Sequence, residues 1–271
     1  MRKTIYLLTL IIVCLLINIG CDVSKSSGAK ITVSNSYIES AIIDIIGKEE
    51  KILRLAEPGM CPAHFDIQPS QVNQMNKCKV LFKFDFQKML EERLCKGANN
   101  PVVVSVKANG GLCWPQTYLE ITRQVAKALI DFGLIESSDK RLIEIESRLQ
   151  ELEKQCKAEI AKAGLKGAPV LSSVRQKEFC NWLGLDVVGT FTAADITGFN
   201  EIENAITAGK FKNVKFIIAN KPEGRRLADA LAERLNAKVV VFGNFPEDKD
   251  DVSFDAMVLN NVAALINSDG K

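Results

Sequence analysis

Short apolar runs alternate with longer amphipathic segments along most of this 271-residue chain. The short runs are rich in β-branched residues, which is typical of buried parallel strands. The longer segments repeat apolar residues three or four positions apart, as a helix with one buried face does. We expect strands at residues 31–33, 52–55, 80–82, 102–104, 170–171, 187–188, 216–219 and 239–242. We expect helices at residues 36–46, 69–75, 86–94, 115–130, 139–163, 174–183, 202–208, 223–235 and 254–266.

The clearest helix lies in the middle of the chain, from Asp139 to Ala163, with Ser138 as its expected N-cap. At 1.5 Å per residue it would be roughly 37 Å long, the span of a whole domain. Gly164 and Gly167 are expected to end it. Ser36 is likewise the expected N-cap of the first helix. The apolar stripe of the long helix consists of Leu142, Ile145, Leu149, Leu152, Cys156 and Ile160.

Alternating strands and helices stand on both sides of this long helix, which predicts an α/β fold with largely parallel sheets. We therefore expect two similar α/β lobes joined by one long, rigid helix. The predicted limits are 30–137 for the N-terminal lobe, 138–164 for the connecting helix and 165–271 for the C-terminal lobe. Ligands of such sheets bind at the carboxyl ends of the strands, so the predicted site is a cleft between the lobes. The loops expected around it are 56–68, 83–87, 107–115, 172–176, 219–225 and 243–247.

The first twenty residues have the pattern of an export signal. Two basic residues precede an apolar run from Ile5 to Ile19, which is too short for a comfortable membrane span. The run ends at Gly20-Cys21, which resembles a lipoprotein cleavage box and makes Cys21 the predicted site of lipidation. Residues 21–29 then form a polar tether. We expect the body of the protein on the periplasmic side, outside the cytoplasm and anchored to the membrane by lipid. An uncleaved anchor helix at residues 1–20 is the alternative.

Composition is that of an ordinary globular protein, with 47% hydrophobic and 25% charged residues. The net charge of +2, with both signs mixed along the chain, gives no argument for a nucleic-acid partner. Beyond the signal segment and Cys21, the six cysteines permit fifteen pairings, and their spacing selects none. Three of them lie in apolar patterns and are expected to be small buried side chains. The six are Cys61, Cys78, Cys95, Cys113, Cys156 and Cys180, and the three are Cys78, Cys156 and Cys180.

The only histidine, His64, lies in a Pro- and Gly-rich stretch from Pro58 to Ser70. Cys61 precedes it by three residues, and a thiolate and an imidazole at this spacing can bind one metal ion. The stretch resembles the loop that carries the first metal ligand in the substrate-binding proteins of zinc and manganese ABC importers. In that family the pattern is Pro-Gly-x-x-Pro-His, an aromatic residue, and then Pro-Ser. Here the histidine stands one place later, and a cysteine replaces the usual acid.

Three further segments resemble the same family in the same order. Residues 111–118 resemble its His-x-Trp-x-Asp-Pro-x-Asn-Ala region, and residues 179–189 its Tyr-x-x-x-x-Tyr-Gly-Leu segment. Residues 213–242 resemble its penultimate helix and final strand. The resemblance implies a monomeric, non-enzymatic substrate-binding protein that captures a metal ion between its lobes and delivers it to an ABC permease in the membrane. It also implies that closure of the lobes is small, because the long helix limits bending.

Most of the family's metal ligands have no counterpart here. The resemblance places the second and third histidines near Gly110 and Ser173, and the carboxylate near Gly243. One interpretation is a site rebuilt from softer ligands. Such a site favours Zn²⁺, with Cu or another divalent metal as the alternative. Its candidate ligands are His64 and Cys61, joined by Cys113, Cys180 or Asp85. A disulfide between Cys61 and Cys113, clamping two cleft loops, is the structural alternative.

A second interpretation is that the cleft binds a metal chelate or a small anionic organic ligand. The candidate residues follow strands or begin helices, where backbone N–H groups and cations favour anions. Solvated surface charge is the alternative for the charged members of this set. The set is Phe84, Trp114, Arg175, Gln176, Lys221, Glu223 and Arg225. A thiol-dependent enzyme using Cys61, His64 and Asp66 is a more distant interpretation, since no catalytic motif accompanies them.

Overall fold

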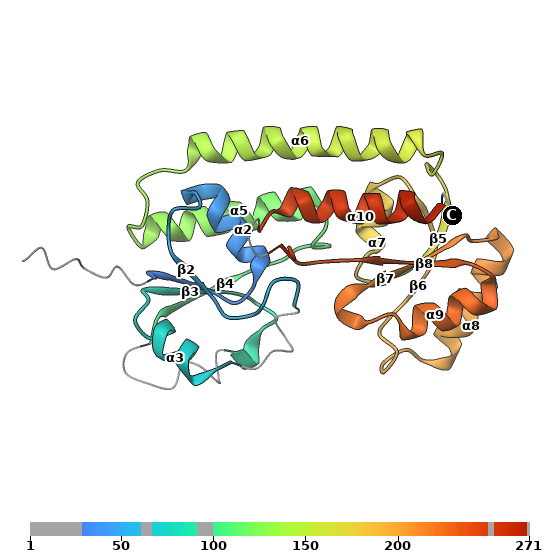
Figure 1. Ribbon diagram of the computed structural model, residues 1–271, viewed down its shortest axis with the longest axis horizontal. Helices are drawn as coiled ribbons and strands as arrows, with labels where there is room; N and C mark the ends of the chain where they lie inside the picture. Colours follow the sequence, from blue (N-terminus) through green and yellow to red (C-terminus); the bar gives the residue numbers. More distant parts are fainter. Residues whose placement is uncertain (1–28, 61–66, 91–99, 249–251, 270–271) are drawn as a thin grey trace, which may run out of the picture.

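The computed structural model describes residues 29–60, 67–90, 100–248 and 252–269. Its N-terminal lobe contains a four-stranded parallel sheet in the order β2-β1-β3-β4 (Figure 1). The central strand β1 pairs with both β2 and β3, and β3 continues the sheet to β4. The strands are β1 (Ile31–Val33), β2 (Ile52–Arg54), β3 (Val80–Phe84) and β4 (Val102–Val106).

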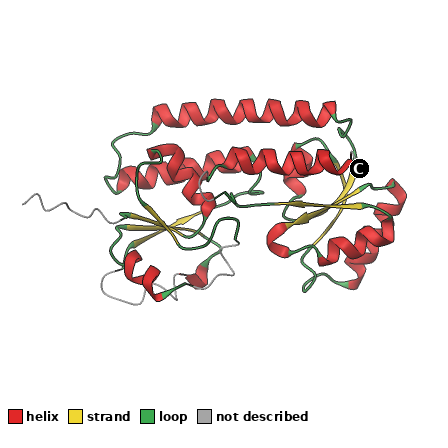
Figure 2. Ribbon diagram, viewed as in Figure 1, coloured by secondary structure: helices red, strands yellow, loops and turns green. Residues whose placement is uncertain are grey.

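The C-terminal lobe repeats this design with the order β6-β5-β7-β8, and all of its pairs are parallel. Each predicted strand is present, most of them extended by one to four residues. The two α/β lobes, each built on a parallel sheet, confirm the predicted fold class. Figure 2 distinguishes their helices from their strands by colour. The strands are β5 (Pro169–Ser173), β6 (Asp186–Phe191), β7 (Phe216–Asn220) and β8 (Lys238–Phe242).

The helices follow the predicted segments with differences at their ends. In the N-terminal lobe they are α2 (Ser36–Ile46), α3 (Pro69–Met75) and α5 (Pro115–Asp131). The connecting helix is α6 (Asp139–Lys162). The C-terminal half has α7 (Lys177–Trp182), α8 (Phe199–Lys212), η1 (Lys221–Glu223), α9 (Arg226–Leu235) and α10 (Phe254–Asp269). Of the predicted helix at 86–94, residues 88–90 are helical, and residues 91–99 lie outside the described part.

One predicted N-cap is displaced by a residue, and another is in place without a capping hydrogen bond. Asn35, not Ser36, is the N-cap of α2, and its side-chain oxygen accepts hydrogen bonds from the N–H groups of Tyr37 and Ile38. An Asn side chain is at least as good a cap as Ser, and here it stands one residue earlier. Ser138 occupies the predicted N-cap position of α6, but its side chain makes no capping hydrogen bond.

The helix α6 spans both lobes, and α10 runs beside it from the boundary between the lobes across the C-terminal lobe (Figure 1). The chain leaves β8 in the C-terminal lobe and begins α10 against α2 of the N-terminal lobe. One buried apolar cluster therefore includes residues of both halves, from Tyr37 and Tyr118 to Phe242 and Phe254. The division at 137/138 and 164/165 stays a prediction, since this shared core crosses it. Among the described residues, no helix combines the length and apolar character that crossing a membrane requires.

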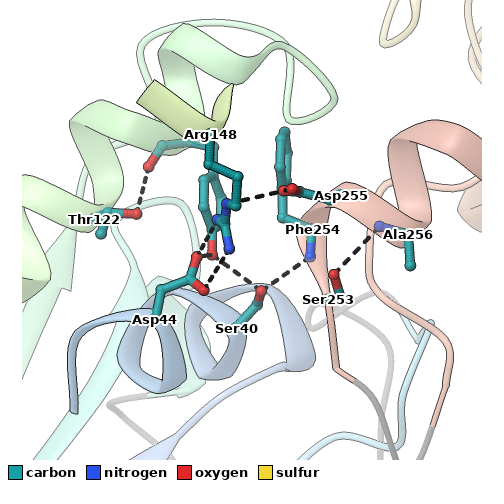
Figure 3. Close-up of polar contacts among 9 residues, drawn as sticks. Ser40, Asp44, Thr122, Arg148, Ser253, Phe254, Asp255 and Ala256 are labelled. Atoms are coloured by element: carbon teal, nitrogen blue, oxygen red, sulfur yellow. Dashed lines mark hydrogen bonds and ion pairs between the residues drawn. The ribbon is translucent and has the colours of Figure 1, made fainter. Parts of the chain in front are cut away.

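Polar contacts fasten the start of α10 to the N-terminal lobe (Figure 3). Arg148 of α6 donates two hydrogen bonds to the carboxylate of Asp44 in α2, at 2.9 and 2.6 Å. Its Nε atom lies 3.3 Å from Asp255 Oδ2 in α10. The Phe254 N–H donates to Ser40 Oγ at 3.1 Å. Three helices that are distant in the sequence thus meet at one guanidinium, which we call the Arg148 clamp.

Candidate functional site

A cleft of about 570 Å³ opens between the lobes at the carboxyl ends of both sheets. This size falls within the range of small-molecule sites and far exceeds the space that a bare ion needs. The loops around it are those predicted after β3, β4, β5, β7 and β8. The N-terminal lobe contributes Phe86, Ala108, Gly110, Gly111 and Leu112. The C-terminal lobe contributes Val174, Arg175, Lys177, Glu178, Asn220, Pro222, Glu223, Asn244 and Phe245.

Two carboxylates lie in this cleft, and both already have partners. Glu178 of α7 accepts a hydrogen bond from the N–H of Gly111, across the boundary between the lobes. Glu223 accepts from the Ser173 hydroxyl at 2.7 Å, and its other oxygen lies 3.5 Å from Arg175 Nε. The sequence patterns did not indicate Glu178 as a cleft residue. Its position two residues beyond the expected cleft loop 172–176 gave no sign that its side chain reaches the other lobe.

Three carboxamides form the floor of the cleft on the side of the C-terminal lobe. Gln176 is fully buried, and its Nε2 donates to Asn220 Oδ1 at 3.1 Å and to Asn244 Oδ1 at 2.6 Å. Gln176 was predicted as a cleft residue, and it acts here beneath the surface by orienting two residues that do line the cleft. The two asparagines were missed, although both fall in loops predicted to surround it.

Cys113 lies beneath the cleft, buried between the lobes. Its thiol donates to the carbonyl of Gly243 at 3.0 Å, and Asn261 Nδ2 lies 3.6 Å from its sulfur. Burial raises the pKa of this thiol well above its ordinary value. Because a metal binds the thiolate, a raised pKa disfavours ligation in this arrangement. Cys113 is a free thiol in the structure, which differs from the disulfide alternative.

The three cysteines predicted to be small buried side chains are buried, and they are free thiols like Cys113. They are Cys78, Cys156 and Cys180. Burial raises the pKa of the Cys180 thiol to about 12, and that of Cys156 to about 12. Cys180 contacts the Ser172 hydroxyl at 3.6 Å. It therefore has the environment of a core residue rather than of a metal ligand.

The remaining N-lobe candidates surround the cleft without all facing it. Asp85 is exposed at the end of β3, and its N–H donates to Val106 O at 3.0 Å. Phe84 is fully buried, and its ring stacks on Phe86, with the ring centroids 5.0 Å apart. Phe86 is thus the aromatic wall that was assigned to Phe84 from the sequence. Trp114 is half-buried at the N-cap of α5 and is not among the lining residues.

The predicted cations of the C-terminal lobe take separate positions. Arg175 lines the cleft with an exposed side chain. Lys221 pairs with Glu247 and lines a neighbouring cavity of about 340 Å³ rather than the cleft. Arg225 is exposed, and its guanidinium is paired with Asp229 by hydrogen bonds of 2.7 to 3.0 Å. That pairing raises the pKa of Arg225 and lowers that of Asp229. The guanidinium therefore binds a carboxylate of its own helix rather than facing the cleft.

Cys61 and His64, the first-ranked metal ligands, and Cys21 lie outside the described residues. Within the described residues, no three His, Cys, Asp or Glu side chains gather closely enough to hold a metal ion. Two positions where the resemblance places family ligands have a neighbouring side chain close to where a Cβ atom would lie. A Cβ atom at Gly110 would lie 2.7 Å from Thr117 Oγ1, and one at Gly243 would lie 3.0 Å from Glu247 Oε1. Larger side chains at these two positions would require their neighbours to move.

Comparison with known proteins identifies the family. The profile of the family described as zinc-uptake complex component A, periplasmic, matches residues 31–268. The chain belongs to this family. It is a family of periplasmic, metal-binding substrate-binding proteins, whose members deliver metal to an ABC permease and are transport proteins rather than enzymes. No curated protein matches the sequence.

Solved structures with the same fold are distant in sequence. A Mn-bound periplasmic metal-binding protein from Candidatus Liberibacter asiaticus shares 12% identity, with a TM-score of 0.71 over 88% of this chain and 98% of that one. A crystal structure of ZnuA shares 14% identity, with a TM-score of 0.69 over 89% and 99%. The Pseudomonas aeruginosa substrate-binding protein FpvC, in complex with Mn²⁺, shares 12%, with a TM-score of 0.69 over 89% and 98%. At this level of identity these structures support the fold alone and leave the ligand open.

Proposed function

We propose that this zinc-uptake family member is a lipid-anchored, extracytoplasmic substrate-binding protein that captures a metal ion in the cleft and delivers it to an ABC permease. The observation that supports this most strongly is the cleft itself, formed by both lobes at the carboxyl ends of both sheets. Ligands of open parallel sheets bind at this edge. Cys21 would anchor the protein, and residues 21–29 would give it reach from the membrane.

Zinc is the favoured metal. The proposed ligands with the greatest weight are His64 and Cys61, because imidazole and thiolate suit Zn²⁺ and disfavour Mn²⁺. Gly59, just before them, donates its N–H to the carbonyl of Pro246 in the opposite lobe at 2.9 Å. The segment that carries both ligands therefore begins at the boundary between the lobes. Asp85 would add an exposed carboxylate; Cys113 could join only after leaving its bond to Gly243.

A zinc titration tests this proposal. Competition with a chromophoric chelator would measure zinc affinity for the mature protein and for His64→Ala and Cys61→Ser. We expect His64→Ala to abolish tight zinc binding without changing the thermal melting temperature, since one of few ligands is lost. Cys78→Ser is the matched control for the second variant, because Cys78 is buried near the opposite end of β3 and bonds to Ala29 O. Unchanged affinity in both ligand variants would contradict the proposed site.

A metal chelate or small anionic organic ligand is the second candidate. The size of the cleft favours it, as do the exposed Arg175 and Lys177 on its rim. Both candidates keep the same scaffold and the same delivery to a permease. They differ in whether the protein or the ligand supplies most of the metal's donor atoms.

A further inference from the structure

Two asparagines at the floor of the cleft present their amide nitrogens to it. Asn220 ends β7 and Asn244 follows β8, so the parallel sheet brings both to one edge. Their exposed fractions are only 3% and 6%, yet both line the cleft. Such deeply placed polar groups are costly unless something satisfies them.

The orientation of both side chains is set from below. Gln176 Nε2 donates to the Oδ1 atoms of both asparagines, and the Cys113 thiol lies 3.2 Å from Asn244 Oδ1. In each asparagine, the NH₂ group is therefore the end of the side chain that Gln176 does not bind. In the described part of the chain neither NH₂ has a hydrogen-bond partner, and neither nitrogen is among the fully enclosed side-chain atoms that lack one. Both nitrogens thus reach the open space of the cleft.

This arrangement selects against a bare cation at the floor. An amide NH₂ group carries two donors and no lone pair, so it binds oxygen acceptors. The only metal-ligating atoms of these side chains, the Oδ1 atoms, are turned toward Gln176. On the rim, Arg175 and Lys177 balance the two paired cleft carboxylates, Glu178 and Glu223. Phe86, Leu112 and Phe245 supply apolar walls. Together these groups suit a small organic molecule that bears carboxylate oxygens.

We propose that the floor of the cleft, Asn220 and Asn244 held by Gln176, binds the carboxylate oxygens of a small organic chelator, and that the metal enters the cleft as the complex of that chelator. This inference rests on the proposed metal capture and names the form in which the metal is recognised. The chelator supplies free oxygen donors, whereas the cleft carboxylates Glu178 and Glu223 already have partners.

Isothermal titration at pH 7.5 with three titrants tests it: zinc citrate, zinc chloride and metal-free citrate. The variants Asn220→Asp and Asn244→Asp keep the shape of the side chain but replace NH₂ with a carboxylate oxygen. We expect each to weaken zinc citrate binding at least about tenfold, because a hydrogen bond to a charged acceptor becomes a repulsion. Asn181→Asp, which makes the same change on an exposed face of α7, should leave affinity unchanged.

The outcomes separate this inference from the proposed function. If the wild type and both Asp variants bind zinc citrate equally, the inference is overturned. If the wild type also binds zinc chloride in that case, metal capture is left intact. Failure of both zinc titrants, while metal-free citrate binds and the Asp variants weaken it, supports the carboxylate floor and overturns metal capture. Failure of all three overturns both.

A surface variant keeps the test independent of folding at buried positions. Arg175→Ala changes an exposed side chain that forms an ion pair with Glu223. It should weaken zinc citrate several-fold and leave the melting temperature unchanged. Lys210→Ala, on an exposed part of α8, is the charge-matched control on the same lobe. Equal zinc citrate affinity in these two variants would contradict a role for the rim cation.

Discussion

The two sides of the boundary between the lobes are built on different principles. On the helix side, the Arg148 clamp joins α2, α6 and α10, and the Phe254 ring stacks on Tyr118 with centroids 4.0 Å apart. On the cleft side, the described lobes meet through isolated bonds, such as the one from the Gly111 N–H to Glu178. Dense packing holds the first side in one arrangement, while the second leaves side chains available to a ligand.

This contrast assigns stability and recognition to different residues. Substitutions on the helix side should lower the free energy of unfolding, because buried aromatic area and paired charges are lost there. Substitutions on the cleft side should change ligand affinity with little change in stability. It also limits domain motion, since α6 spans both lobes and the start of α10 contacts α2 of the N-terminal lobe (Figure 1). Closure around a ligand is then expected to be a small rocking movement.

The largest effect is expected from Phe254→Ala. The Phe254 side chain is almost fully buried and contacts both Tyr37 and Tyr118. Its truncation should lower the free energy of unfolding by about 3–5 kcal/mol, through lost burial and the cavity left behind. Urea denaturation measures this. Phe199→Ala is the control, because that ring is 75% exposed. A loss of stability as small as that of the control would contradict a packed helix side.

Arg148→Met should have the next largest effect. It keeps the apolar stem of the side chain but leaves the Asp44 carboxylate without its two hydrogen bonds from the guanidinium. Because the Arg148 side chain is 39% exposed, we expect a loss of about 2–3 kcal/mol, below the cost of breaking a fully buried pair. Arg141→Met, on an exposed turn of the same helix beside Glu144, should cost less than about 0.5 kcal/mol. Similar losses in the two variants, by the same denaturation, would mean that the clamp does not join the lobes.

The smallest effect concerns pH. Burial raises the pKa of Asp255; Arg148 partly offsets this and Asp44 adds to it. The native state therefore binds this proton more tightly than the unfolded chain does. The stability that this group contributes is fully present below the ordinary carboxyl pKa of about 4. It is lost as the pH rises through the raised pKa of Asp255. Asp255→Asn should reduce the fall in the free energy of unfolding over that window. Asp186→Asn, at an exposed strand end, should leave it unchanged.

Local sequence patterns predicted the elements well, because strands and helices here follow apolar periodicity. The long helix was predicted to within one residue of its end, at Lys162. The cap of α2 was misplaced because Ser36 and Asn35 are both good caps and stand side by side. Long-range partners could not be predicted this way. Nothing near Arg148 in the sequence indicates Asp44, which lies 104 residues away.

The candidate site shows the same limit more sharply. Five of the six predicted cleft loops contribute lining residues to the cleft, since carboxyl ends of parallel strands are identifiable from strand order. Which side chains face inward was harder to predict. Arg175 and Glu223 line the cleft, whereas Lys221 and Arg225 are paired elsewhere. Lys221 pairs with Glu247, which lies 26 residues away and which no local pattern indicates. Arg225 pairs with Asp229 one helical turn later, a spacing that the sequence does show.

The metal content of the purified protein shows whether it captures zinc. The mature protein would be purified anaerobically from cells grown in metal-replete medium and examined by elemental mass spectrometry, beside His64→Ala. The account predicts near-stoichiometric zinc in the wild type and its loss in the variant. A metal-free wild type that also fails to take up zinc, whether added as chloride or as citrate, would contradict metal capture by this member of the family.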